Sequence, residues 1–138
     1  MKIHAKVENS QGYHQVTLQT NDHVHSIEIP PRTSGFGSSA NGGELLFLAL
    51  ATCYCNDLYR EAANKGIQID RVDIEVDGDF GAEGEPASNI TYRAKVTSRA
   101  SNAEVRDLMA ITDRVAEIHN TLRAGRPVTL AEVEIQTQ

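Results

Sequence analysis

The stretch that decides the fold is ELLFLALATCYC, residues 44–55, which lies within a helix predicted for residues 44–65. From Leu45 to Cys53 every residue except Thr52 is apolar. A helix that is apolar on all sides is buried on all sides. A chain of 138 residues has little material with which to surround such a helix. The pattern therefore predicts that a partner subunit covers part of it.

Alternating apolar and polar residues predict strands on both sides of this helix. Three short runs within residues 3–29, separated by turn-like residues, predict a three-stranded antiparallel meander. Residues 30–43 are rich in Pro, Gly and Ser and predict a long loop. Residues 72–77 and 90–97 alternate strongly, with acidic residues on the polar side of the first run and basic ones on the second. We expect these two strands to form cross-strand charge pairs.

The last third of the chain predicts a second helix and a final strand. Ser101 and Glu104 match a capping box, which marks a helix start. Apolar residues then recur every three or four positions as far as Leu122, so one face of this helix is apolar. Residues 123–127 end the helix, and residues 128–135 predict a strand.

The predicted order is βββ-α-ββ-α-β, which indicates an α+β fold. The length suits one domain over residues 1–138. The net charge is −6 and the pI is about 5.3, with no basic stripe, so nucleic acid is not an expected partner. No apolar run approaches the ~20 residues that span a bilayer, and no signal peptide is recognisable. We therefore expect a cytoplasmic protein, with no membrane partner and no cofactor.

The chain has two cysteines, Cys53 and Cys55, both on the predicted first helix. So few cysteines argue against a disulfide scaffold. Cys53 is the only credible catalytic residue. The alternative is an inert buried thiol, since free cysteine is among the most buried residue types.

Three segments carry a resemblance to a known family. GGELLFLALATC (42–53), ANKGIQIDRVDIEVDGDF (63–80) and HNTLRAGRPVTLAEVEI (119–135) occur in this order. Together they resemble the OsmC/Ohr family, and the spacing from Glu44 to Cys53 resembles its YhfA-like branch. The similarity extends over nearly the whole chain and is weakest in the first thirty residues.

The resemblance implies an interleaved, swapped homodimer whose two central helices lie between antiparallel sheets. It also implies reduction of organic hydroperoxides and hydrogen peroxide. In that chemistry a cysteine thiolate attacks the peroxide, becomes sulfenic acid, and is resolved by a second cysteine. Cys53 matches the first of these cysteines.

The second cysteine of the family is missing. Ala116 occupies its position, and Glu117 occupies the position of the proline that follows it in the family motif. Cys55 is a poor substitute for the missing second cysteine, because the side chains of residues two apart on a helix, such as Cys53 and Cys55, point about 200° apart. Resolution is therefore expected to need an external thiol.

The arginine and glutamate that support the family's thiolate are also not matched. The glutamate position falls on Gly43, with Glu44 one residue later, and Arg32 in the long loop is the nearest substitute for the arginine. The alternative to this role is that Arg32 is a solvent-exposed charged residue of the loop. Arg123 and Arg126, after the second helix, are further candidates.

Polar residues near the missing cysteine form a second group of candidates. His119 could act as a base or donate to the Cys53 thiolate. The alternative is a partly exposed histidine at a helix end. Asn120 matches a family position and could hold the helix end. His23 and His25 lie on one face of a predicted strand, but no further ligands accompany them, so no metal site is predicted.

Two functions follow from these observations. The first is a thiol-dependent hydroperoxide reductase that uses Cys53 as nucleophile and an external thiol as resolver. The second is a catalytically silent dimer that binds a small apolar ligand at the dimer cleft.

Overall fold

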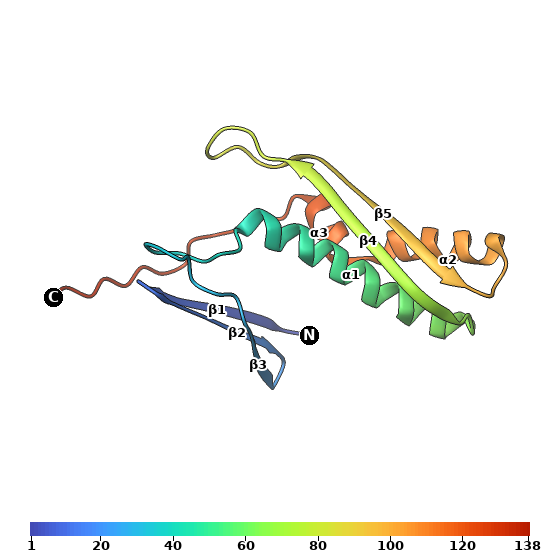
Figure 1. Ribbon diagram of the computed structural model, residues 1–138, viewed down its shortest axis with the longest axis horizontal. Helices are drawn as coiled ribbons and strands as arrows, with labels where there is room; N and C mark the ends of the chain where they lie inside the picture. Colours follow the sequence, from blue (N-terminus) through green and yellow to red (C-terminus); the bar gives the residue numbers. More distant parts are fainter. The chain divides into compact units, whose positions relative to one another are not determined.

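The computed structural model describes residues 1–138 and has an α+β architecture, as predicted (Figure 1). It contains two compact units, residues 1–46 and 47–138, and each is described by itself. The prediction of a single domain stays a prediction. The elements are β1 (Ile3–Ser10), β2 (Tyr13–Thr20), β3 (His23–Ile27), α1 (Gly42–Lys65), β4 (Ile69–Asp79), β5 (Ser88–Ser98), α2 (Asn102–Val115) and α3 (Glu117–Ala124).

The first unit is the predicted meander followed by the Gly-rich loop. Strands β1, β2 and β3 pair antiparallel in sequence order. The tight β1–β2 turn places Gly12 at φ +72°, a conformation that glycine adopts without strain. The side chain of Asn9 holds the loop by accepting from the backbone N–H of Gly37 at 3.0 Å and donating to its carbonyl at 3.1 Å.

Helix α1 begins and ends where local sequence signals place it. Asn41 and Glu44 exchange side-chain to backbone hydrogen bonds of 2.8 and 2.9 Å, which satisfies two free N–H groups at its start. Gly66 follows the helix at φ +68°, as expected of a C-terminal glycine. Leu50 and Tyr54 are buried, whereas Leu48 remains 57% exposed. One chain thus buries only part of the apolar helix.

The second unit is built on the β4–β5 hairpin, which runs across α1 (Figure 1). The predicted charge pairs are confirmed, because Arg93 on β5 contacts Glu75 at 2.7 Å and Asp77 at 3.0 Å on β4. The ring of Phe47 packs closely on Gly78, since a Cβ there would lie 2.6 Å from Cζ of Phe47 and would displace the ring. The inner face of the hairpin packs on a core formed by Tyr54, Leu58, Ala62 and Leu108.

The predicted second helix is in fact two helices, α2 and α3. The predicted capping box of Ser101 and Glu104 is present. The break falls at Ala116, which is fully buried in an extended conformation (φ −68°, ψ 109°). A helix end leaves carbonyls without partners. Two side chains of α3 replace the lost bonds: Asn120 donates to the carbonyl of Arg114 at 3.0 Å, and Arg123 donates to that of Asp113 at 3.1 Å.

The strand predicted over residues 128–135 is wrong for the single chain. These residues have no regular secondary structure, and their apolar side chains are exposed: Val128 100%, Leu130 83%, Val133 69% and Ile135 86%. A strand requires a neighbour to pair its backbone groups, and no strand of this chain pairs with the segment. None of the helices combines the length and apolar character needed to cross a membrane.

Candidate functional site

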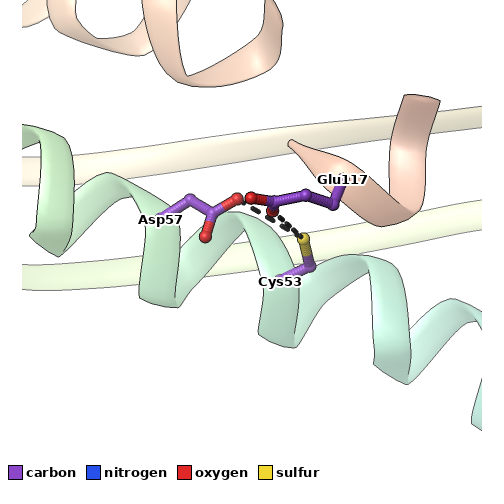
Figure 2. A group of neighbouring side chains, drawn as sticks. All are labelled: Cys53, Asp57 and Glu117. Atoms are coloured by element: carbon purple, nitrogen blue, oxygen red, sulfur yellow. Dashed lines mark hydrogen bonds between the residues drawn. The ribbon is translucent and has the colours of Figure 1, made fainter. Parts of the chain in front are cut away.

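Cys53 lies on α1 in a small cluster of charged side chains (Figure 2). Its thiol donates to Oδ2 of Asp57 at 3.5 Å and lies 3.9 Å from Oε2 of Glu117. Asp57 follows Cys53 by four residues, so both side chains project from the same face of the helix. Glu117 comes from the first turn of α3, which the break at Ala116 turns toward α1.

Arg60 completes the cluster from the next turn of α1. Its Nη1 lies 2.9 Å from Oδ1 of Asp57 and 3.7 Å from Oε1 of Glu117. Asp57 is only 5% exposed, and a buried carboxylate needs a partner of opposite charge. Arg60 is that partner, and it joins the two carboxylates on the side away from the sulfur.

The surroundings of Cys53 favour the neutral thiol. Burial raises the pKa of the Cys53 thiol, and the negative charges of Asp57 and Glu117 raise it further. The backbone N–H of Ile118 lowers this pKa. That N–H belongs to the first turn of α3, where helix N–H groups have no partner within the helix. The sulfur therefore has one backbone donor but no adjacent cation.

The two carboxyl groups differ in proton affinity. Burial raises the pKa of Asp57, and the neighbouring Glu117 raises it further, against the opposing effect of Arg60. The pKa of Glu117 is lowered, first by its own backbone N–H and then by Asp57 and Arg60. Asp57 therefore takes a proton before Glu117 does. A carboxylate with raised basicity in contact with a thiol can accept the thiol proton.

The same three side chains could offer ligands to a metal ion. One ligand atom from each of Cys53, Asp57 and Glu117 lies within 4.8 Å of the others. Thiolate and carboxylate ligands suit Zn²⁺, which usually takes four ligands in a structural site and three in a catalytic one. Arg60 already contacts an oxygen of each carboxylate and offsets one of their two negative charges, so these carboxyl groups are paired within the protein.

Two of the predicted supporting residues have other roles in the structure. Glu44 caps the start of α1, more than two helical turns before Cys53. Arg32 lies in the loop of the first unit, where its Nε donates to the carbonyl of Ser38 at 3.5 Å. A role for Arg32 beside Cys53 stays a prediction. The cation of the Cys53 cluster is Arg60.

The other two predicted residues lie on α3. Asn120 holds the helix break, as its suggested role at the helix end requires. His119 is 4% exposed, so the alternative of a partly exposed histidine is wrong. Its ring packs edge-on against Tyr92, with centroids 4.7 Å apart, and neither ring nitrogen has a hydrogen-bond partner.

Asp57, Arg60 and Glu117 were not predicted from the sequence as members of the site. Asp57 and Arg60 had a signal, because an acidic residue four positions after the cysteine, with a basic one three further on, shares its helix face. Glu117 was noted only as the replacement of a family proline. Nothing local indicated that it would lie against a residue 64 positions away.

Cys55 faces a different part of the molecule. It lines a small space together with Val72 and Ile74 of β4, while Cys53 faces α3. Both cysteines are free thiols. The position of the family's second cysteine, Ala116, is fully buried. The second unit therefore holds no resolving thiol beside Cys53.

Comparison with solved structures shows the same fold in proteins of low sequence identity. An OsmC-like protein from Mycoplasma pneumoniae matches with a TM-score of 0.60 and 19% identity, covering 88% of this chain and 89% of its own. An organic hydroperoxide resistance protein OsmC from Legionella pneumophila matches with a TM-score of 0.59 and 17% identity, covering 89% and 90%. An OsmC-like hydroperoxide resistance protein from Jannaschia sp. CCS1 gives 0.55 and 12%, covering 99% and 92%.

The sequence itself matches a family model. No curated protein sequence matches the chain. The model of the family described as OsmC-like protein matches residues 35–131, which include α1, the β4–β5 hairpin and both C-terminal helices. This match extends over well more than half of the chain and includes Cys53 and its three charged neighbours. The chain belongs to the OsmC-like protein family.

Proposed function

We propose that this OsmC-like protein is a thiol-dependent hydroperoxide reductase in which Cys53 is the nucleophile and an external thiol is the resolver. The observation that carries the proposal is the contact of the Cys53 thiol with Asp57, within a cluster closed by Glu117 and Arg60. Hydroperoxide resistance is named for two proteins of the same fold, which supports the same class of substrate.

The cluster supports a mechanism in which proton transfer accompanies attack. Asp57 accepts the proton of the Cys53 thiol as the sulfur attacks the terminal oxygen of the hydroperoxide. The O–O bond breaks, an S–O bond forms, and the departing alkoxide takes the proton from Asp57. The sulfur is oxidised to sulfenic acid and the hydroperoxide is reduced to an alcohol. Arg60 and Glu117 hold Asp57 in position throughout.

An external thiol is needed to close the cycle. A reductant thiol attacks the sulfenic acid to form a mixed disulfide and water, and a second reductant thiol releases Cys53. Ala116 replaces the family's resolving cysteine, and Cys55 faces β4 instead. A cytoplasmic location is part of this proposal, because thiol reductants are kept reduced there.

We also propose that the protein is a homodimer. Support comes from the exposed Leu48 on an otherwise apolar stretch of α1 and from the exposed apolar side chains of residues 128–135. A second copy would supply both a cover for α1 and a strand partner for the C-terminal segment. Light scattering at micromolar concentration should give twice the chain mass. A monomer would contradict the dimer but not the chemistry of Cys53.

The activity is tested by consumption of cumene hydroperoxide in the presence of a panel of small and protein thiols. We expect turnover by the native chain and by Cys55→Ser, and background consumption by Cys53→Ser. Mass spectrometry of the oxidised native chain should find one added oxygen on Cys53. Equal, background-level consumption by the native chain and Cys53→Ser would overturn the proposal.

A second candidate function is a catalytically silent dimer that binds a small apolar ligand. The raised pKa of Cys53 favours it, since the thiol is then mostly protonated at neutral pH. An apolar cavity between α1, β5 and α3 also favours it. If peroxide consumption fails while the protein remains folded, this candidate takes precedence.

A further inference from the structure

A cavity of about 260 Å³ lies in the second unit, beside the Cys53 cluster but separate from it. Its walls come from α1, β5 and α3, and most of its lining is apolar. This volume is below the roughly 300–1,000 Å³ of sites that hold drug-sized molecules, so a smaller molecule would fill it. The lining residues are Leu50, Ile90, Tyr92, His119, Leu122 and Arg123.

His119 is the unusual member of this lining. Its side chain is 4% exposed, yet neither Nδ1 nor Nε2 has a hydrogen-bond partner in the protein. Buried polar atoms are almost always paired, so an unpaired one requires an explanation. The ring packs against Tyr92 at 4.7 Å and Tyr54 at 6.0 Å between centroids, which fixes its orientation. His119 is also one of the residues that line the cavity, so a molecule held there is a candidate partner for its ring nitrogens.

The other polar groups of the lining are already paired. The hydroxyl of Tyr92 donates to Asp113, and Nη2 of Arg123 lies 2.8 Å from the same carboxylate. Nη1 of Arg123 also donates to Asn120 at 3.2 Å. Asp113 and Arg123 thus neutralise each other, and the cavity has no spare charge for an ionic ligand.

The ring of His119 is itself uncharged at neutral pH. Burial lowers the pKa of His119, and the neighbouring Arg123 lowers it further, while Asp113 acts in the opposite direction. A neutral imidazole has one N–H donor and one acceptor nitrogen. A hydroxyl group can pair with either nitrogen, because it both donates and accepts.

We propose that this cavity binds a small uncharged apolar molecule with a single hydroxyl group, of the phenol or short alcohol class, which hydrogen-bonds to His119. The apolar body packs on Leu50, Ile90 and Leu122. The proposal is independent of the proposed peroxidase, because no atom of the ligand needs to react and Cys53 does not line the cavity. Binding should therefore be the same in Cys53→Ser.

The test compares three probes of similar size on the full native chain: p-cresol, toluene and 4-methylbenzoate. Titration followed by NMR should show p-cresol binding about tenfold more tightly than toluene, since a hydrogen bond to a buried unpaired group is worth about that factor. The imidazole signals of His119 should shift with p-cresol and remain in place with toluene. The charged 4-methylbenzoate should bind most weakly.

A matched pair of variants completes the test. His119→Leu should remove the preference for p-cresol over toluene, and the exposed-residue control His23→Leu should retain it. If His119→Leu does not fold, the comparison of probes on the native chain decides the matter alone. Equal affinity for p-cresol and toluene, no binding at millimolar p-cresol, or p-cresol binding without a shift of the His119 signals would each overturn the proposal.

Discussion

The thiol of Cys53 lies 3.5 Å from Oδ2 of Asp57, one helical turn further along α1. The usual arrangement for a reactive cysteine places a cation beside the sulfur so that the thiolate forms before the substrate arrives. Here the cation, Arg60, lies on the far side of two carboxylates. The sulfur therefore lies beside a carboxylate, and in the proposed mechanism the reactive thiolate forms during attack.

Replacing Asp57 should have opposite effects on the stability of the Cys53 thiolate and on proton transfer from the thiol. In Asp57→Asn the loss of a negative charge lowers the pKa of Cys53, so alkylation by iodoacetamide at pH 7 should be roughly three- to tenfold faster. Peroxide consumption should be at least about tenfold slower, because the general base is gone. The exposed Asp107→Asn serves as control. Faster alkylation with faster peroxide consumption would show that Asp57 only suppresses the thiolate.

Replacing Arg60 should have the opposite effect on alkylation. Arg60→Gln leaves Asp57 and Glu117 uncompensated beside the sulfur, so the pKa of Cys53 should rise and alkylation at pH 8 should be several-fold slower. The cost in unfolding free energy should be roughly 1–3 kcal/mol, more than for a fully exposed pair, because Asp57 is 5% exposed and loses its partner of opposite charge. Urea unfolding measures the second effect, with Arg106→Gln as the exposed control. An unchanged rate of alkylation would show that Arg60 does not influence the Cys53 thiol.

The stability of the fold should depend on pH through Cys53. Because burial raises the thiol pKa in the folded state, the folded chain holds this proton more tightly than the unfolded chain. The stabilisation of the folded chain by this proton is fully present at pH values below the thiol pKa of the unfolded chain, about 8.5. It is lost as the pH rises through the higher thiol pKa of the folded chain. Urea midpoints from pH 7 to 10 should fall faster for the native chain than for Cys53→Ser. Parallel curves would contradict the raised pKa.

The break between α2 and α3 should depend on Asn120. Asn120→Ala leaves the carbonyl of Arg114 without its partner and should cost roughly 0.5–1.5 kcal/mol of unfolding free energy. Because the first turn of α3 places the Ile118 N–H at Cys53, alkylation of Cys53 should also become slower. Asn64→Ala, on the exposed end of α1, is the control. A loss of stability with an unchanged alkylation rate would show that the helix break does not influence the reactivity of Cys53.

Local signals in the sequence determined most of the elements. The Gly-rich loop and Gly66 limit α1, the alternation of residues 72–77 and 90–97 sets the β4–β5 pair, and Ser101 with Glu104 starts α2. Each of these depends on residues close in sequence, where backbone conformation and side-chain periodicity act directly. The position of Cys53 on a mostly apolar helix was predictable for the same reason.

The tertiary structure alone decided the chemistry around that cysteine. The periodicity of residues 101–122 is continuous, so it could not reveal the break at Ala116. That break depends on hydrogen bonds from Asn120 and Arg123 back to α2, and it brings Glu117 to the sulfur and His119 into a cavity. The strand predicted over residues 128–135 also depends on tertiary structure. A strand needs a neighbouring strand to pair its backbone groups, and its own residues cannot supply one. The sequence determined where the thiol lies on its helix, and packing between distant segments decided which groups contact it.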